Sequence, residues 1–125
     1  MADVVAERRA EQRRLIGLAR AYVERLSTRL SVLAAAVVGS VARGDFNVWS
    51  DIDVVVVCDD LPHRVLDRMA MLMPEDTRGV QPVGFTRDEF REAWGKGNPL
   101  ATSVTEDGVI LLGDEVFVEL SSRST

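Results

Sequence analysis

Two aspartates, Asp51 and Asp53, are the residues of this chain with the clearest capacity for chemistry. They precede and open an apolar run at residues 54–57 that is typical of a buried strand. Because side chains alternate along a strand, both carboxylates face the same side, about 7 Å apart, where their charges repel. A divalent cation between them removes this conflict, and carboxylate oxygens suit Mg²⁺ or Mn²⁺. The pattern therefore predicts a metal site at Asp51 and Asp53.

A glycine–serine pair ahead of the aspartates supplies the complementary half of a site. Gly39 and Ser40 follow a first apolar run, residues 33–38, where a strand is expected to end in a turn. Glycine leaves the backbone free to turn, and the amides and hydroxyl of such a turn can hold a polyphosphate. Together with the metal ligands, this pair predicts a site for a metal-bound nucleoside triphosphate.

These residues resemble the signature of the nucleotidyltransferase superfamily that includes DNA polymerase β. They most resemble its minimal nucleotidyltransferases, whose pattern is Gly-Ser-x-Ala-Arg-Gly followed by Ser-Asp-hydrophobic-Asp. In this chain the first part stands at residues 39–44 and the second at residues 50–53. The resemblance implies transfer of a nucleoside monophosphate to a hydroxyl acceptor, with AMP from ATP as the expected donor chemistry.

The resemblance also assigns roles to individual residues. It implies that Asp51 and Asp53 are both catalytic and metal-binding, with Mg²⁺ or Mn²⁺ as the cofactor. It implies that four residues serve the nucleotide: Gly39, Ser40, Arg43 and Ser50. Without the resemblance, Arg43 is a surface arginine beside Asp45, and Ser50 is a residue that ends a loop. The motif match suggests that Ser50 supports Asp51 through a hydrogen bond.

The third metal ligand is where the sequence departs from the pattern. In this superfamily a third carboxylate, on a neighbouring strand, completes the site. The strand expected at residues 80–86 carries Gln81 at the best-matching position, and a glutamine offers a carbonyl oxygen but no charge and no base. Glu75 and Asp76 are nearby carboxylates that can substitute. Two interpretations stay open: an active enzyme, and a degenerate nucleotide-binding module that neutralises a partner by binding.

A protein partner is a further implication of the resemblance. Many minimal nucleotidyltransferases are encoded beside a small helical HEPN protein, and the two act as antitoxin and toxin. In that family the transferase neutralises its partner by adding AMP to a tyrosine. Antibiotic modification is disfavoured, because 125 residues leave no room for a second domain that would build a drug pocket.

Charge and composition limit the other classes of partner and the compartment that are expected for this chain. A net charge of −5 argues against direct binding to nucleic acid, which requires a basic surface. No apolar run approaches the roughly 20 residues that span a membrane, and no signal peptide opens the chain, so the cytoplasm is the expected compartment. A single cysteine, Cys58, excludes an internal disulfide and is expected to be buried.

The order of apolar and polar segments predicts an α+β fold, a small mixed β-sheet flanked by helices, in one domain of residues 1–125. The first helix is expected at residues 2–30 with its arginines on a solvated face, the motif core at 33–58, and a frayed tail at 121–125. Trp49, in a loop, is either an exposed stacking platform or folded onto the core. Further helices are expected at 62–73, 88–95 and 99–105, and further strands at 51–58, 109–112 and 116–120. The apolar side chains of the helix at 62–73 are expected to face inward, namely Val65, Leu66, Met69, Ala70 and Leu72.

Overall fold

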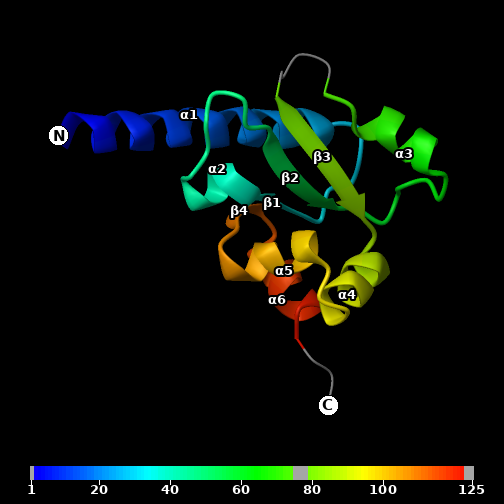
Figure 1. The fold of residues 1–125 in the computed structure, drawn as a ribbon. Coiled ribbons are helices and arrows are strands. Elements are labelled where there is room, and N and C mark those ends of the chain that lie inside the picture. The colour runs from blue at the N-terminus through cyan, green and yellow to red at the C-terminus, as the bar shows by residue number, and fades with distance from the viewer. Residues whose placement is uncertain (1, 75–78, 123–125) are drawn as a thin grey trace.

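The computed structural model describes residues 2–74 and 79–122 (Figure 1). The tail expected to fray lies partly outside these ranges, and so do Glu75 and Asp76. The elements, in chain order, are α1 (Ala2–Leu26), β1 (Ala34–Val38), α2 (Gly39–Arg43), β2 (Ile52–Val57), α3 (Val65–Leu72), β3 (Val80–Phe85), α4 (Arg87–Gly95), α5 (Pro99–Glu106), β4 (Val109–Leu112) and α6 (Asp114–Leu120).

The four strands of the described residues form one mixed sheet in the order β3-β2-β1-β4. The central strand β1 runs antiparallel to both β2 and β4, whereas β2 and β3 are parallel. Helix α1 lies along one face of the sheet, and α4, α5 and α6 gather on the other face (Figure 1). This arrangement confirms the expected mixed sheet flanked by helices.

The strands β1 and β2 are covered on both faces, which explains their continuous apolar sequence. Every residue of β1 is at most 1% exposed, and so are the valines of β2. On one face these strands pack against Tyr22 and Leu26 of α1, and on the other against Phe90, Phe117 and Leu120. The core therefore holds in place the two strand ends that carry the glycine turn and the aspartates.

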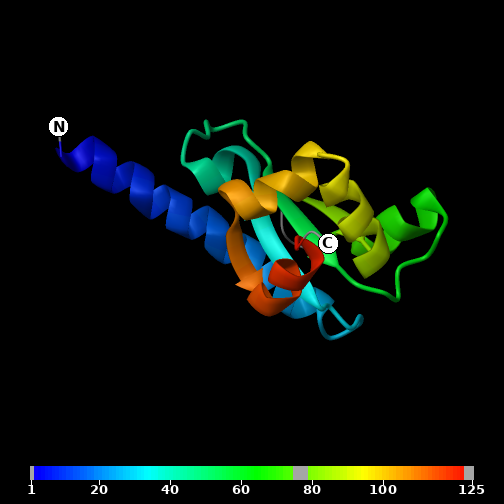
Figure 2. The same cartoon turned by 90° about the horizontal axis from the view of Figure 1, so that it is seen from below.

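Helix α1 packs into the core only through its C-terminal half. Ala19, Tyr22, Val23 and Leu26 are buried, while residues 3–10 are exposed and project beyond the sheet (Figure 2). The helix ends at Leu26 rather than at residue 30, because the chain continues in a turn in which the Ser27 hydroxyl donates back to the Val23 carbonyl, 2.8 Å away. Within residues 2–74 and 79–122, no helix is both long and apolar enough to cross a membrane.

The strand expected at residues 116–120 is wrong, because these residues belong to helix α6. A short apolar run after the Gly113-Asp114 turn favoured a strand, but Gly113 adopts a left-handed φ of 73° and precedes a helix. Phe117 and Leu120, three residues apart, then enter the core, and the Phe117 ring lies 5.4 Å from Phe90. Val118 is left 63% exposed on the outer side. The packing of Phe117 against Phe90 thus accompanies a helix rather than a strand at these residues.

The expectation that the apolar residues of α3 face inward is also wrong for most of them. Only Leu72 is buried, whereas Val65, Leu66 and Met69 are more than half exposed. The inward face is taken by Arg68, whose guanidinium donates to the Pro62 and Gly84 carbonyls and pairs with Glu89. An apolar face of α3 is therefore left uncovered at the edge of the sheet.

Candidate active site

The two halves of the motif meet where β1 ends and β2 begins. The antiparallel register pairs Val38 with Asp53, so Gly39 turns the chain directly beside that aspartate. Gly39 has a φ of 76°, and a Cβ built on it would lie 2.6 Å from Oδ2 of Asp53. Any side chain larger than hydrogen would collide with the carboxylate while adopting an unfavourable backbone conformation. The glycine and the aspartate thus form one structural unit.

The two aspartates share a site of concentrated negative charge. Asp53 is half-buried in β2, and Asp51 is exposed just before the strand, which begins one residue later than expected. Burial raises the pKa of the Asp53 carboxyl, the charge of Asp51 raises it further, and the Arg43 cation lowers it. Partial burial next to a like charge is a strained environment for a carboxylate, and a divalent cation between the two groups would relieve it.

Gln81 lies in the position expected for the third ligand. The parallel register of β2 and β3 pairs Asp53 with Gln81, so their side chains leave the sheet on the same face. Within the described residues, no three His, Cys, Asp or Glu side chains come together as a metal site. The donors that the described residues offer are therefore two carboxylates and one amide oxygen, a hard oxygen set that fits Mg²⁺ or Mn²⁺ but carries only two negative charges.

The remaining residues of the motif lie on α2 and in the loop that follows it. Ser40 is in the first turn of α2, where its carbonyl accepts hydrogen bonds from the Gly44 and Asp45 amides at 2.8 and 3.1 Å. Arg43 is at the end of α2, and its Nε donates to the Asp45 carboxylate at 3.2 Å. The Ser50 hydroxyl accepts a hydrogen bond from the Asn47 amide at 2.9 Å. This bond closes the loop ahead of Asp51, and a role of Ser50 at the nucleotide or in support of Asp51 stays a prediction.

The tip of this loop presents apolar surface to solvent. Val48 and Trp49 are each 89% exposed, and the Trp49 amide donates to Oδ1 of Asn47 at 2.8 Å. Trp49 is therefore an exposed ring two residues before Asp51 rather than a residue folded onto the core. Its position suits contact with a base or with an incoming partner.

Two residues of α1 that no sequence pattern distinguishes from their neighbours also contact the motif. Arg8 donates to the carbonyls of Gly44 and Phe46, and Gln12 donates to the carbonyls of Val41 and Ala42. Arg8 is one of several arginines on the polar side of the helix, and helical periodicity treats them alike. Arg14 forms an exposed ion pair with Glu11 at 2.5 Å, as expected for the solvated face of a helix. Arg8 instead bonds to backbone carbonyls of the motif segment.

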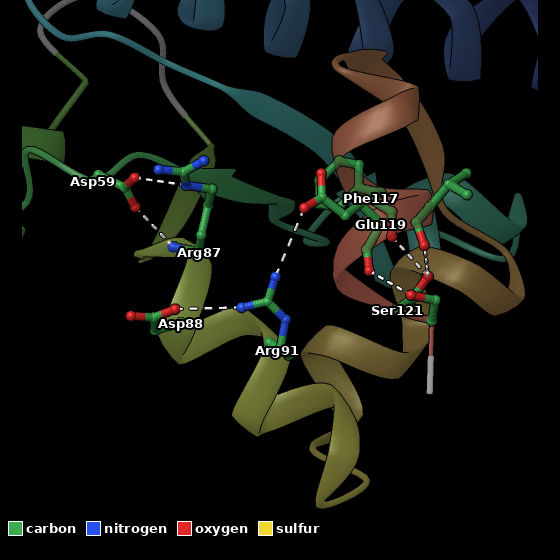
Figure 3. A network of polar contacts seen from close by, with 9 residues as sticks. Asp59, Arg87, Asp88, Arg91, Phe117, Glu119 and Ser121 are labelled. Atoms are coloured by element: carbon green, nitrogen blue, oxygen red, sulfur yellow. Dashed lines mark hydrogen bonds and ion pairs between the residues drawn. The ribbon is translucent and has the colours of Figure 1, made fainter. Parts of the chain in front are cut away.

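A second group of charges lies past the opposite end of β2 (Figure 3). Asp59 accepts hydrogen bonds from the backbone amide and the Nε of Arg87, at 3.0 and 2.7 Å. Arg91 pairs with Asp88 at 3.3 Å and with Glu119 at 4.0 Å. Each arginine faces a carboxylate, so these groups neutralise one another and connect the loop after β2 to α4 and α6.

Comparison with known proteins agrees with this geometry. The model of the nucleotidyltransferase domain family matches residues 19–104, and the chain belongs to that family. A solved structure, that of a candidate nucleotidyltransferase from Sulfolobus solfataricus, is similar with a TM-score of 0.57 and 25% sequence identity. That match covers 82% of this chain and 84% of the other. No curated protein matches the chain significantly.

The raised pKa of Asp53 predicts an unusual effect of Asp53→Asn on stability. A carboxyl whose folded pKa lies above its unfolded pKa contributes stability at low pH, and this contribution is lost as the pH rises through the folded value. At neutral pH the ionised group therefore destabilises the fold, and Asp53→Asn should unfold at a higher temperature than the wild type in metal-free buffer. Thermal unfolding with and without Mn²⁺ measures this, with Asp67→Asn, an exposed carboxylate on α3, as the control.

The same experiment examines the metal site. Mn²⁺ should raise the unfolding temperature of the wild type and of Asp67→Asn, because a ligand that binds only the folded state stabilises it. Asp53→Asn should lose most of this increase. An equal response to Mn²⁺ in all three proteins would contradict a metal site at Asp53.

The contact between Gly39 and Asp53 predicts coupling between these positions. Gly39→Ala should destabilise the wild type through both backbone strain and the collision with the carboxylate. In an Asp53→Ala background the collision is absent, so the same substitution should cost clearly less. A double-mutant cycle by urea unfolding measures the difference. Equal costs in the two backgrounds would mean that only the φ angle requires glycine at this position.

Proposed function

We propose that the protein transfers a nucleoside monophosphate, AMP from ATP, to a hydroxyl of a partner protein. The observation that carries this proposal is the contact of the Gly39 turn with Asp53, beside Asp51, in a chain of the nucleotidyltransferase domain family. Family membership supports a nucleoside triphosphate as substrate and nucleotidyl transfer as the reaction. The choice of AMP and of a protein acceptor follows from the minimal-nucleotidyltransferase motif.

Each side chain has a distinct task in this mechanism. Asp51 and Asp53 would hold the divalent cation, which when bound offsets the charge of the triphosphate and of the attacking hydroxyl. The turn at Gly39 and Ser40 would bring backbone amides against the phosphates, since no Cβ obstructs the approach. Arg43 adds a positive charge close enough to lower the pKa of Asp53. The chain thus contributes mainly position and electric field, as phosphoryl transfer requires.

Gln81 sets the expected balance between binding and catalysis. A neutral amide beside Asp53 leaves two fixed charges where related sites place three. We expect the nucleotide, which carries its own metal, to bind well, while activation of the acceptor hydroxyl is weak because the neutral Gln81 is no base. The alternative function, a module that neutralises its partner by binding alone, rests on this same substitution.

The uncovered apolar face of α3 supports a protein partner. Val65, Leu66, Met69 and Met73 are between 55 and 76% exposed. A groove of about 500 Å³ runs between this helix and β3, and Gln81 lines it. Exposed apolar side chains in this number are typical of a protein-binding surface, and methionines adapt to the partner's shape. A partner on this surface, for which a HEPN protein is our candidate, would lie at the β3 edge of the sheet, on the side of α1, whereas the Asp53 side chain leaves the sheet on the opposite face.

Restoring a carboxylate at position 81 should increase transfer. Gln81→Asp adds a metal ligand and a base beside Asp53, so incorporation of labelled AMP into the partner should rise above that of the wild type. Gln81→Asn, equal in size to the aspartate but neutral, serves as the matched control. Fast transfer by the wild type that Gln81→Asp abolishes would show that another group, such as Glu75 or Asp76, supplies the third charge.

A charge on α3 should separate partner binding from nucleotide binding. Leu66→Asp should abolish the complex with the partner while calorimetry shows unchanged affinity for Mg²⁺–ATP. Val118→Asp, at a similarly exposed apolar residue on α6, is the control and should leave the complex intact. Loss of the complex in both variants would contradict docking on α3. Neutralisation of the partner that survives Asp53→Asn would favour the alternative, binding without catalysis.

A further inference from the structure

Helix α1 forms side-chain hydrogen bonds to the segment that follows the glycine turn, residues 41–46. Nε of Arg8 donates to the Gly44 carbonyl at 2.9 Å, and a terminal nitrogen donates to the Phe46 carbonyl. The guanidinium also lies 4.6 Å from the centre of the Phe46 ring. One turn further along, Nε2 of Gln12 donates to the Val41 and Ala42 carbonyls at 2.8 and 3.2 Å. Two side chains of α1 thus hold four backbone carbonyls between residues 41 and 46.

Val41 and Phe46 fix this segment in the core, and the backbone between them depends on further contacts. Helix α2 has five residues, too few for a helix that is stable by itself, and its last carbonyls have no partner within the helix. A groove of about 950 Å³ separates α1 from the loop at residues 45–50, so that loop is not packed closely against the helix. The Arg8 guanidinium bridges the two elements beside this groove, and Phe46 below it is buried. The α1 contacts therefore restrain the path from Gly39 to Phe46.

We propose that Arg8 and Gln12 are positioning residues for the nucleotide site, a role that rests on the proposed function. They hold α2 and the following loop so that Gly39 stays over Asp53 and Arg43 stays near it. Both residues precede the segment that matches the family model, residues 19–104, so that match gives them no role. Neither touches the metal ligands, and their effect is transmitted through the backbone of α2.

The surroundings of Arg8 distinguish positioning from a contribution to the core. Residues 3–10 of α1 are exposed, and the buried residues of the helix begin at Ala19. Truncation of Arg8 therefore removes hydrogen bonds to the motif segment and the contact with the Phe46 ring, but no side chain of the core cluster. The free energy of unfolding should therefore change little, while the turn at Gly39 loses a restraint on its position.

The test compares Arg8→Ala, Arg8→Lys and Arg9→Ala in the full chain. Arg9 is the exposed neighbour of Arg8 on the same helix, so Arg9→Ala controls for loss of charge. We expect Arg8→Ala to weaken Mg²⁺–ATP binding about tenfold or more by calorimetry, with an unfolding temperature close to that of the wild type. Arg8→Lys keeps the charge but loses the guanidinium fork, and should recover part of the affinity. Affinity equal to that of Arg9→Ala would overturn the proposal.

Hydrogen exchange provides a readout that does not depend on nucleotide. The amides of Gly44 and Asp45 donate to the Ser40 carbonyl, so their exchange reports whether α2 stays closed. Exchange at both should accelerate in Arg8→Ala and in Gln12→Ala but not in Arg9→Ala. Equal protection in all variants would overturn the positioning role. If the wild type binds no Mg²⁺–ATP while exchange responds as expected, the proposed function fails and the restraint of α2 stands.

Discussion

The contact between the Gly39 turn and the Asp53 carboxylate is the constraint on which the site depends. Antiparallel pairing of β1 with β2 places Val38 opposite Asp53, and the chain has to turn away within one residue of that pair. Only glycine accommodates both the left-handed φ and the carboxylate 2.6 Å from its missing Cβ. The buried valines of the two strands hold this register, because a shift of one residue would turn apolar side chains from one core face to the other.

The pairing of β3 with β2 fixes which position lies beside Asp53, but not which side chain occupies it. It places Gln81 beside Asp53 through backbone hydrogen bonds alone, so the register does not require any particular side chain at position 81. As an edge strand it contains Pro82, which cannot donate to a further strand, while Arg68 occupies the Gly84 carbonyl. A partner at this edge therefore has to bind through side chains, such as those of the apolar α3 face, rather than by extending the sheet.

Sequence reasoning succeeded where one local pattern determined the structure. The continuous valines predicted that strand β2 is covered on both faces. The position of the Gly-Ser pair and of the aspartates next to their apolar runs predicted that the two halves of the motif face one site. It failed at α6, because a short apolar run after a turn does not show whether its residues form a strand or a helix, and here Phe117 packs against Phe90 from a helix. It also missed Arg8, because its partners are backbone carbonyls 36 and 38 residues away, which no periodicity within a helix reveals.

The two ends of β2 show why the aspartates are best explained by a ligand. Past the C-terminal end, Asp59 is neutralised by Arg87, and neighbouring carboxylates are paired with Arg91 (Figure 3). At the other end, neither Asp51 nor Asp53 forms an ion pair in the part of the chain that the structure describes, although Arg43 is close enough to affect the pKa of Asp53. Arg43 pairs with Asp45 instead. A fold that pairs its carboxylates at one end and leaves two together at the other retains charge that a bound cation can balance.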